Sequence, residues 1–184
     1  MVKGVKAMAL WSNSFPASGT LDGYISRMAS GDTQGLELLY QAVSPGVYAF
    51  ALSVLKNSHD AEDVLQDTFL RVYNGAAAYR SQGKPMAWIL TIAKNLCYKR
   101  LQEQQRTGTA PQEWQNYTQS NISADDKAVI WACMEQLSDD ERQIVVLHAV
   151  AGFKHREIAQ MLDEKLSTVL SKYHRAIKKL KENF

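Results

Sequence analysis

Cysteine and histidine are scarce in this sequence. The chain has two cysteines and four histidines among 184 residues, and none of them lies at the spacing of a metal-binding motif. Cys97 and Cys133 each fall in a helical pattern, so we expect buried free thiols in a reducing cytosol. No pair of nucleophile and base and no phosphate-binding loop is visible. We therefore expect no enzyme activity, no cofactor and no metal.

Long apolar runs and a large net charge are also absent. Near the N-terminus the apolar run of residues 7–11 is too short for the core of a secretory signal, and no stretch reaches the length of a membrane span. We expect a cytoplasmic protein with no membrane insertion. The net charge is +2, from 21 basic and 19 acidic residues. Only the local distribution of charge can therefore indicate a nucleic-acid partner.

Helical periodicity is abundant in the chain. Apolar residues recur three or four apart from residue 21 onward, with breaks expected at Gly31-Asp32 and at Pro45-Gly46. Residues 1–20 lack this period and predict a flexible arm. The Gly-, Thr-, Pro- and Gln-rich composition of residues 106–124 predicts a linker. The expected fold class is all-α, with two small helical domains joined by a flexible linker, the C-terminal one a helix-turn-helix. The domains span residues 21–105 and 125–184.

Residues 57–73 predict a helix with an acidic face. Asp60 is expected to cap its N-terminus, and Gly75 to end it. Acidic residues near a helix N-terminus are favoured by the helix dipole and need no binding partner. Gln66 and Asp67 lie beyond that first turn, so an exposed acidic binding face is the second interpretation.

The next segment is basic. Residues 79–84 predict a polar loop, and Pro85 is suited to the first position of the helix that follows. Residues 79–106 contain six Lys or Arg and one acidic residue. Aromatic and amide side chains interleaved with cations suit single-stranded nucleic acid, since bases can stack on the rings. Partial burial as packing residues is the alternative for Trp88 and Tyr98, and for Trp88 both interpretations stay open.

Residues 138–180 predict a helix-turn-helix. Ser138 and Glu141 have the spacing of a capping box, and Gly152 can adopt the left-handed conformation that ends the first helix. A short helix is expected over residues 155–162, and a tight turn leads from it into a final helix.

The final helix is expected to have an apolar stripe and a polar, basic face. Residues 154–184 contain eight Lys or Arg against four Asp or Glu. Hydroxyl groups and cations on one helix face suit the base edges and phosphates of a DNA major groove. For such a helix alone, solvated charges would be the default interpretation. The two short helices and the turn before it favour DNA binding.

The order of these features resembles the extracytoplasmic-function (ECF) group of bacterial sigma factors, the small initiation subunits of RNA polymerase. The resemblance covers roughly residues 21–184. Residues 60–72, DAEDVLQDTFLRV, resemble the acidic helix of the family, and residues 87–96, AWILTIAKNL, are similar to its next helix.

The resemblance implies a protein that binds core RNA polymerase and promoter DNA and initiates transcription without covalent chemistry. The clamp of the polymerase's largest subunit would contact Asp60, Glu62, Asp63, Gln66 and Asp67. The melted −10 element would contact Arg80, Lys84, Trp88, Lys94, Asn95, Tyr98 and Lys99. The duplex −35 element would contact Arg156, Ser167, Thr168, Ser171, Lys172 and Arg175. An anti-sigma factor is a further partner that the family implies.

Two positions depart from the family pattern. The usual turn before the recognition helix is Leu-Gly-Ile/Val-Pro, whereas residues 162–165 are Leu-Asp-Glu-Lys, which removes a glycine and an apolar plug. Leu170 stands where a lysine is frequent in the family.

The alternative function is a stand-alone helix-turn-helix repressor with an N-terminal dimerisation or effector module. Such a repressor would bind palindromic duplex without polymerase.

Overall fold

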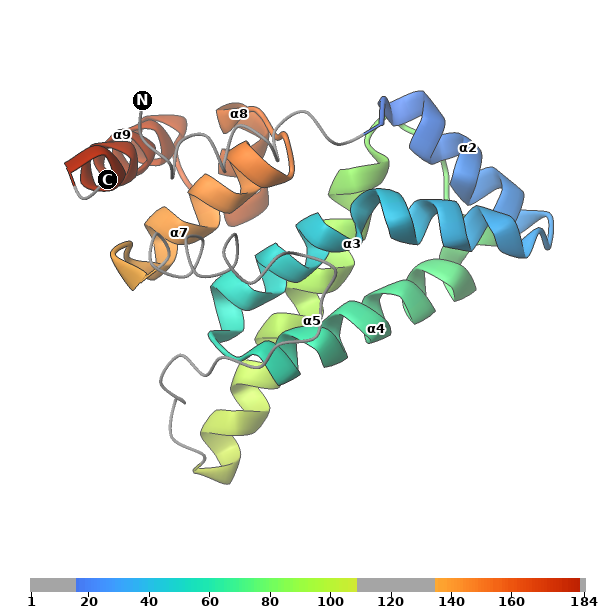
Figure 1. Cartoon of the computed structure of the whole chain (residues 1–184), viewed down its shortest axis with the longest axis horizontal. Helices are drawn as coiled ribbons and strands as arrows, with labels where there is room; N and C mark the ends of the chain where they lie inside the picture. The colour runs from blue at the N-terminus through green and yellow to red at the C-terminus, as the bar shows by residue number, and fades with distance from the viewer. Residues whose placement is uncertain (1–15, 109–134, 183–184) are drawn as a thin grey trace. The chain divides into compact units, whose positions relative to one another are not determined.

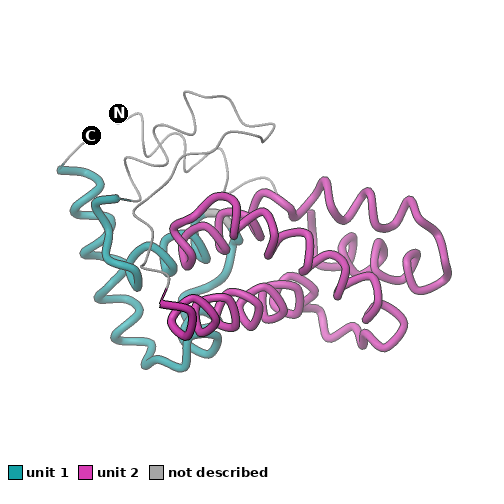
Figure 2. Tube along the Cα trace, turned by 90° about the horizontal axis from the view of Figure 1, so that it is seen from below, with its two compact units in different colours: residues 1–14, 117–184 teal, residues 15–116 magenta. Residues whose placement is uncertain are grey.

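The computed structural model describes residues 16–108 and 135–182, and within these ranges the regular structure is helical throughout. Contacts divide the chain into two compact units, residues 15–116 and residues 1–14 with 117–184 (Figure 2). We call their described parts the N-terminal unit and the C-terminal unit. The expected fold class, all-α in two helical domains of which the second is a helix-turn-helix, is confirmed for the described residues.

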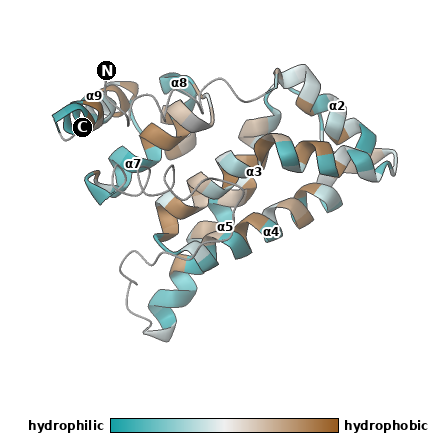
Figure 3. Cartoon of the chain, viewed as in Figure 1, coloured by the Kyte–Doolittle hydropathy of each residue, from teal (hydrophilic) through white to brown (hydrophobic). Residues whose placement is uncertain are grey.

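The N-terminal unit is built around one long helix. Helix α3 packs against each of the other three helices of the unit, and α4 also packs against α5 (Figure 1). The inward side chains Leu39, Val43, Val47 and Phe50 of α3 are at most 1% exposed, and the half of this helix that leads into α4 is the more apolar (Figure 3). The helices of this unit are α2 (Ser18–Ala29), α3 (Thr33–Leu55), α4 (Ser58–Gly75), a 3-10 turn (Ala76–Ala78) and α5 (Pro85–Thr107).

The predicted break at Gly31-Asp32 is confirmed, but the one at Pro45-Gly46 is wrong. Gly31 has a positive φ of 87°, and Asp32 caps α3 by accepting a hydrogen bond from the backbone of Gln34. Pro45 lies inside α3 with its ring exposed to solvent. A proline removes one backbone hydrogen bond of the helix. Burial of the apolar face on both sides of it keeps the helix continuous.

Other boundaries differ from the expected ones by a few residues. Asp60 does not cap α4: the side chain of Asn57 does, by accepting a hydrogen bond from the backbone nitrogen of Asp60 at 3.0 Å. Helix α2 already begins at Ser18, within the expected arm, and α5 continues to Thr107, within the expected linker. The rest of the arm up to residue 15, most of the linker, and residues 125–134 of the second expected domain lie outside the described residues.

The C-terminal unit contains the expected helix-turn-helix. Its elements are α7 (Asp139–Val145) with a π-helical turn (Val146–Val150), α8 (His155–Leu162) and α9 (Leu166–Glu182). The predicted capping box is present: Ser138 Oγ accepts from the backbone nitrogen of Glu141 at 3.4 Å, and Glu141 Oε2 accepts from the backbone nitrogen of Ser138 at 3.0 Å. Gly152, at φ +73°, follows the first helix as expected.

Helix α3 is also long and apolar enough to cross a membrane by length and composition, which the sequence pattern had not suggested. More than half of its most apolar window is buried within the unit. Core helices of soluble proteins meet the same criterion, so this helix is weak evidence for a membrane span.

The close approach of α2 and α3 generates a prediction about stability. A Cβ atom at Gly35 would lie 2.7 Å from the carbonyl oxygen of Tyr24 and 2.9 Å from the backbone nitrogen of Met28. Backbone atoms cannot move aside as a side-chain tip can, so Gly35→Ala should lower the free energy of unfolding by about 1–3 kcal/mol. Thermal and chemical unfolding of the full chain would measure this change.

Gly23→Ala is the matched control, because this glycine lies within α2 and nothing lies within 4 Å of its added Cβ. That substitution should instead stabilise the chain by about 0.5–1 kcal/mol, since alanine favours a helix interior. Equal stabilisation by both substitutions would contradict the close approach.

Candidate functional site

The acidic face of α4 is partly neutralised by α5. Arg100 donates from Nε to Asp60 at 2.8 Å and from Nη2 to Asp63 at 2.6 Å. Gln104 donates to the second carboxylate oxygen of Asp60 at 2.8 Å. The side chain of Asp60 is only 15% exposed. Bonds to both carboxylates raise the pKa of Arg100, that to Asp60 being the larger cause, so these two aspartates join α4 to α5.

The other members of the predicted docking set are freer. Gln66 and Asp67 lie on the exposed side of α4, and Glu62 is half-buried. The same side continues into Leu70, which is 60% exposed, and Tyr73. Sequence reasoning missed both, although Leu70 lies four residues after Gln66 and three after Asp67, a spacing that places them on one helix face.

The predicted −10 set forms a cationic and aromatic face on α5. Four of its members form two pairs one turn apart along the helix, Lys94 with Tyr98 and Asn95 with Lys99. All of them except Lys94 are exposed. The ammonium group of Lys94 lies 5.8 Å from the ring centroid of Tyr98, within the range of a cation–π interaction. An exposed ring beside cations can stack a base while the cations follow the nucleic-acid backbone.

Trp88 belongs partly to the packing of the unit. Its ring lies 4.5 Å from that of Tyr79 between centroids, and a Cβ on Gly75 would lie 3.3 Å from its edge. Tyr79 is in turn fixed, because its hydroxyl donates to Asp22 at 2.8 Å. Burial, followed by this bond, raises the pKa of Tyr79. Arg80 follows Tyr79 in the loop and is exposed to solvent. Half-buried Trp88 therefore packs against this loop, and Arg80 is a cation that the loop exposes.

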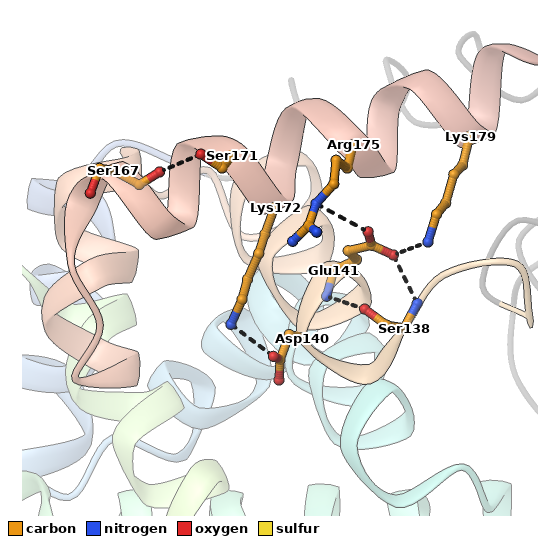
Figure 4. A network of polar contacts seen from close by, with 8 residues as sticks. All are labelled: Ser138, Asp140, Glu141, Ser167, Ser171, Lys172, Arg175 and Lys179. Atoms are coloured by element: carbon orange, nitrogen blue, oxygen red, sulfur yellow. Dashed lines mark hydrogen bonds and ion pairs between the residues drawn. The ribbon is translucent and has the colours of Figure 1, made fainter.

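The predicted −35 set divides between an outer face and an inner one. Ser167, Ser171 and Arg175 are exposed on α9, as is Arg156 on α8, and Thr168 is half-buried. Ser171 Oγ donates to the backbone oxygen of Ser167 at 2.8 Å (Figure 4). This bond leaves the lone pairs of the Ser171 hydroxyl as acceptors.

Lys172 does not lie on that outer face. Its ammonium group binds Asp140 at 2.7 Å and Glu164 at 2.6 Å. Further along α9, Lys179 binds Glu141 at 2.7 Å, whereas Arg175 is 3.9 Å from the same carboxylate (Figure 4). The structure therefore brings only some of the predicted cations to the surface that DNA could reach.

The Cys97 thiol and a cluster of potential metal ligands on α4 are better explained by packing and ion pairing than by a functional site. Burial raises the pKa of Cys97 to about 12, as suits the expected buried thiol, and Cys133 lies outside the described residues. His59, Asp60 and Asp63 place potential metal-ligand atoms within 4.8 Å of one another. Arg100 already binds both of these carboxylates, so the group is better explained as an ion pair than as a metal site.

Comparison with known proteins decides the family. Residues 39–107 match the family model "Sigma-70 region 2", and residues 127–180 match "Sigma-70, region 4". An ECF RNA polymerase sigma factor, SigK of Mycobacterium ulcerans, is 26% identical over 174 residues, which cover 89% of this chain and 93% of SigK. The chain belongs to the ECF sigma factors. SigX of Bacillus subtilis is also 26% identical, over 80% of this chain and 82% of its own length.

Solved structures share the fold of this sigma factor. RpoE from Bartonella quintana, in complex with the anti-sigma factor NepR, superposes with a TM-score of 0.66 at 23% identity, covering 79% of this chain and 94% of RpoE. CnrH, in complex with the cytosolic domain of CnrY, gives a TM-score of 0.58 at 21% identity, covering 88% and 94%. The family models and the curated relatives support the sigma-factor interpretation over the stand-alone repressor.

The C-terminal unit of this sigma factor also contains a stacked pair of histidines that the sequence pattern did not reveal. The rings of His148 and His155 lie 4.1 Å apart between centroids, and Tyr173 of α9 contacts both edge-on at 4.9 and 4.6 Å. His148 Nδ1 donates to the backbone oxygen of Phe153 at 2.8 Å. Burial, and then the charges of His148 and His174, lower the pKa of His155 below 6.5.

This lowered pKa predicts a loss of stability in mild acid. As the pH falls through about 6.5, the unfolded chain binds a proton at His155 before the folded chain does, so the free energy of unfolding should fall as the solution is acidified below neutral pH. His155→Phe keeps a ring against His148 and Tyr173 but cannot be protonated. It should flatten the pH dependence of the unfolding temperature.

His59→Gln provides the control, since the side chain of His59 is 80% exposed on the other unit. This substitution should leave the pH dependence in place. The same pH profile in His155→Phe as in the unsubstituted chain would show that His155 is not responsible.

Proposed function

We propose that this ECF sigma factor docks on core RNA polymerase through α4, holds the melted −10 element on α5, and reads the duplex −35 element with α8 and α9. The observation that carries the proposal is that three surfaces of different chemistry lie on different helices. An acidic face and a cationic, aromatic face occupy neighbouring helices of one unit, and the helix-turn-helix forms the other. The factor would thus direct transcription initiation in the cytoplasm and perform no covalent chemistry.

The docking face centres on Gln66 and Asp67. Both are exposed, and Leu70 extends the face with an apolar surface that a partner can cover. Asp60 and Asp63 contribute negative potential, but their carboxylates are already bound by Arg100. A clamp surface that presents cations around an apolar centre would complement this face.

The proposed promoter contacts are likewise assigned from the exposure and charge of the side chains. The −10 strand would be held on α5 by Lys94, Asn95, Tyr98 and Lys99. Arg80 and Lys84 on the preceding loop would add cations, and Trp88 would pack against this loop. Ser167, Thr168, Ser171 and Arg175 of α9 would contact the −35 element, with Arg156 of α8 on a phosphate. Because several of these contacts involve cations and phosphates, promoter binding should weaken steeply with salt.

An anti-sigma factor is a further proposed partner. Two solved structures share this fold: one is a sigma factor in complex with an anti-sigma factor, and the other is CnrH in complex with the cytosolic domain of CnrY. An inhibitor that covers the docking face of α4 would compete with polymerase for the same residues.

In vitro transcription with purified core polymerase tests the function. Addition of the full chain should produce promoter-specific transcripts from a library of random upstream sequences, and the selected templates should share two elements separated by a fixed spacing. A stand-alone repressor would instead bind palindromic duplex without polymerase. The absence of both core association and core-dependent transcripts would reject the proposal.

The docking assignment gives a sharper prediction. Asp67→Lys places a cation where a complementary clamp would also be cationic, so affinity for core polymerase should fall by tenfold or more, about 1.4 kcal/mol. Helicity and the unfolding temperature should change little, since the side chain is exposed.

Glu37→Lys is the control: it makes the same charge change at an exposed position of α3 and should bind core normally. Equal affinity of both variants for core polymerase, measured by fluorescence anisotropy of labelled full-length chains, would remove Asp67 from the docking face.

A further inference from the structure

The turn between α8 and α9 lacks the glycine and apolar plug that are usual in this family. Asp163 occupies the left-handed position, with a φ of 54°, where glycine would be free of strain. Backbone bonds still close the helix, because the nitrogen of Glu164 donates to the oxygen of Ala159 at 2.9 Å. No apolar side chain of the tripeptide 163–165 anchors the turn, so another contact has to do so.

Glu164 provides that contact. Its Oε1 atom accepts from Lys172 at 2.6 Å, while its Oε2 atom is buried without a hydrogen-bond partner among the described residues. A partly buried carboxylate is costly unless a cation neutralises it. Loss of the lysine charge would leave this carboxylate uncompensated, so Glu164 depends on Lys172.

Lys172 is also tied to the first helix of the motif. Its side chain is only 16% exposed, and its ammonium group lies 2.7 Å from Asp140 of α7. Bonds to Asp140 and then to Glu164 raise its pKa, so it stays charged. Two carboxylates around one ammonium leave a net negative charge, which repels rather than attracts a phosphate.

A second tether lies two turns further along α9. Lys179 binds the nearly buried carboxylate of Glu141, whose side chain is 4% exposed. Two tethers seven residues apart, about 10 Å along the axis, restrict both the tilt and the rotation of α9 against α7 (Figure 4). Ser167 and Ser171 are exposed on the same helix, about 140° and 100° around its axis from Lys172.

We infer that Lys172 is a positioning residue for −35 recognition: bridged between Asp140 and Glu164, it replaces the missing plug of the turn and orients Ser167 and Ser171 toward the base edges. This role replaces the direct DNA contact that the family resemblance implies for Lys172. The inference rests on the proposed function, because it concerns the same DNA-reading face.

Lys172→Met tests this role, because methionine keeps most of the apolar stem and removes the charge. Lys178→Met is the matched control, on the same helix with a side chain that is 76% exposed. The positioning role predicts that Lys172→Met lowers the unfolding temperature of the C-terminal unit by about 4–8 °C, whereas Lys178→Met changes it little. A temperature shift no larger than that of the control would count against the role.

DNA binding separates positioning from direct contact. The holoenzyme is measured on its selected promoter and on the same template with a scrambled −35 element, at several salt concentrations and at a temperature where circular dichroism shows a folded chain. Lys172→Met should lower the affinity ratio of the two templates about tenfold and leave the salt slope unchanged. A slope smaller by about 0.9, with the unfolding temperature unchanged, would identify Lys172 as a phosphate contact and overturn the inference.

The double variant Asp140→Asn with Glu164→Gln gives an independent test without changing Lys172. Removal of two negative charges raises affinity for DNA of any sequence, so binding to the scrambled template should increase. The positioning role predicts that the affinity ratio nevertheless falls. An unchanged or higher ratio would show that these acids only repel DNA. Failure of the unsubstituted holoenzyme to prefer the intact −35 element would instead reject the proposed function.

Discussion

Ion pairs between an acidic helix start and a cation from a later helix hold the functional faces of both units. In the N-terminal unit Arg100 of α5 binds Asp60 and Asp63 near the start of α4. In the C-terminal unit Lys172 and Lys179 of α9 bind acidic residues in the first turn of α7. Helix dipoles favour acids at these starts, and the cations then use them as anchors between helices.

This arrangement changes how the charged residues of the sigma factor are interpreted. A cation that is bound inside its unit orients neighbouring side chains, whereas a cation on the outer face can meet a phosphate. Ser167 and Ser171 are therefore better placed for base contact than Lys172, although all three lie within one and a half turns of α9. On α4, the same distinction separates Gln66 and Asp67 from the two aspartates that Arg100 binds.

Much of the fold could be predicted because its signals are local. The capping box at Ser138, the left-handed Gly152, and the start of α5 at Pro85 depend on residues within one helical turn. The errors arose where local signals competed. Asn57 and Asp60 are both good capping residues, and the structure uses Asn57. Pro45 favours a break, but burial of the α3 face around it outweighs one missing hydrogen bond.

Periodicity, capping and motif spacing are properties of neighbouring residues, so the helical composition, the turns and the resemblance of the two halves to sigma-factor regions could be predicted from the amino-acid sequence. The charges that are available to a partner could not, because they depend on how the helices pack. Whether Asp60 or Lys172 is free depends on which helix faces meet, and the residues that meet them, Arg100 and Asp140, lie 40 and 32 positions away along the chain.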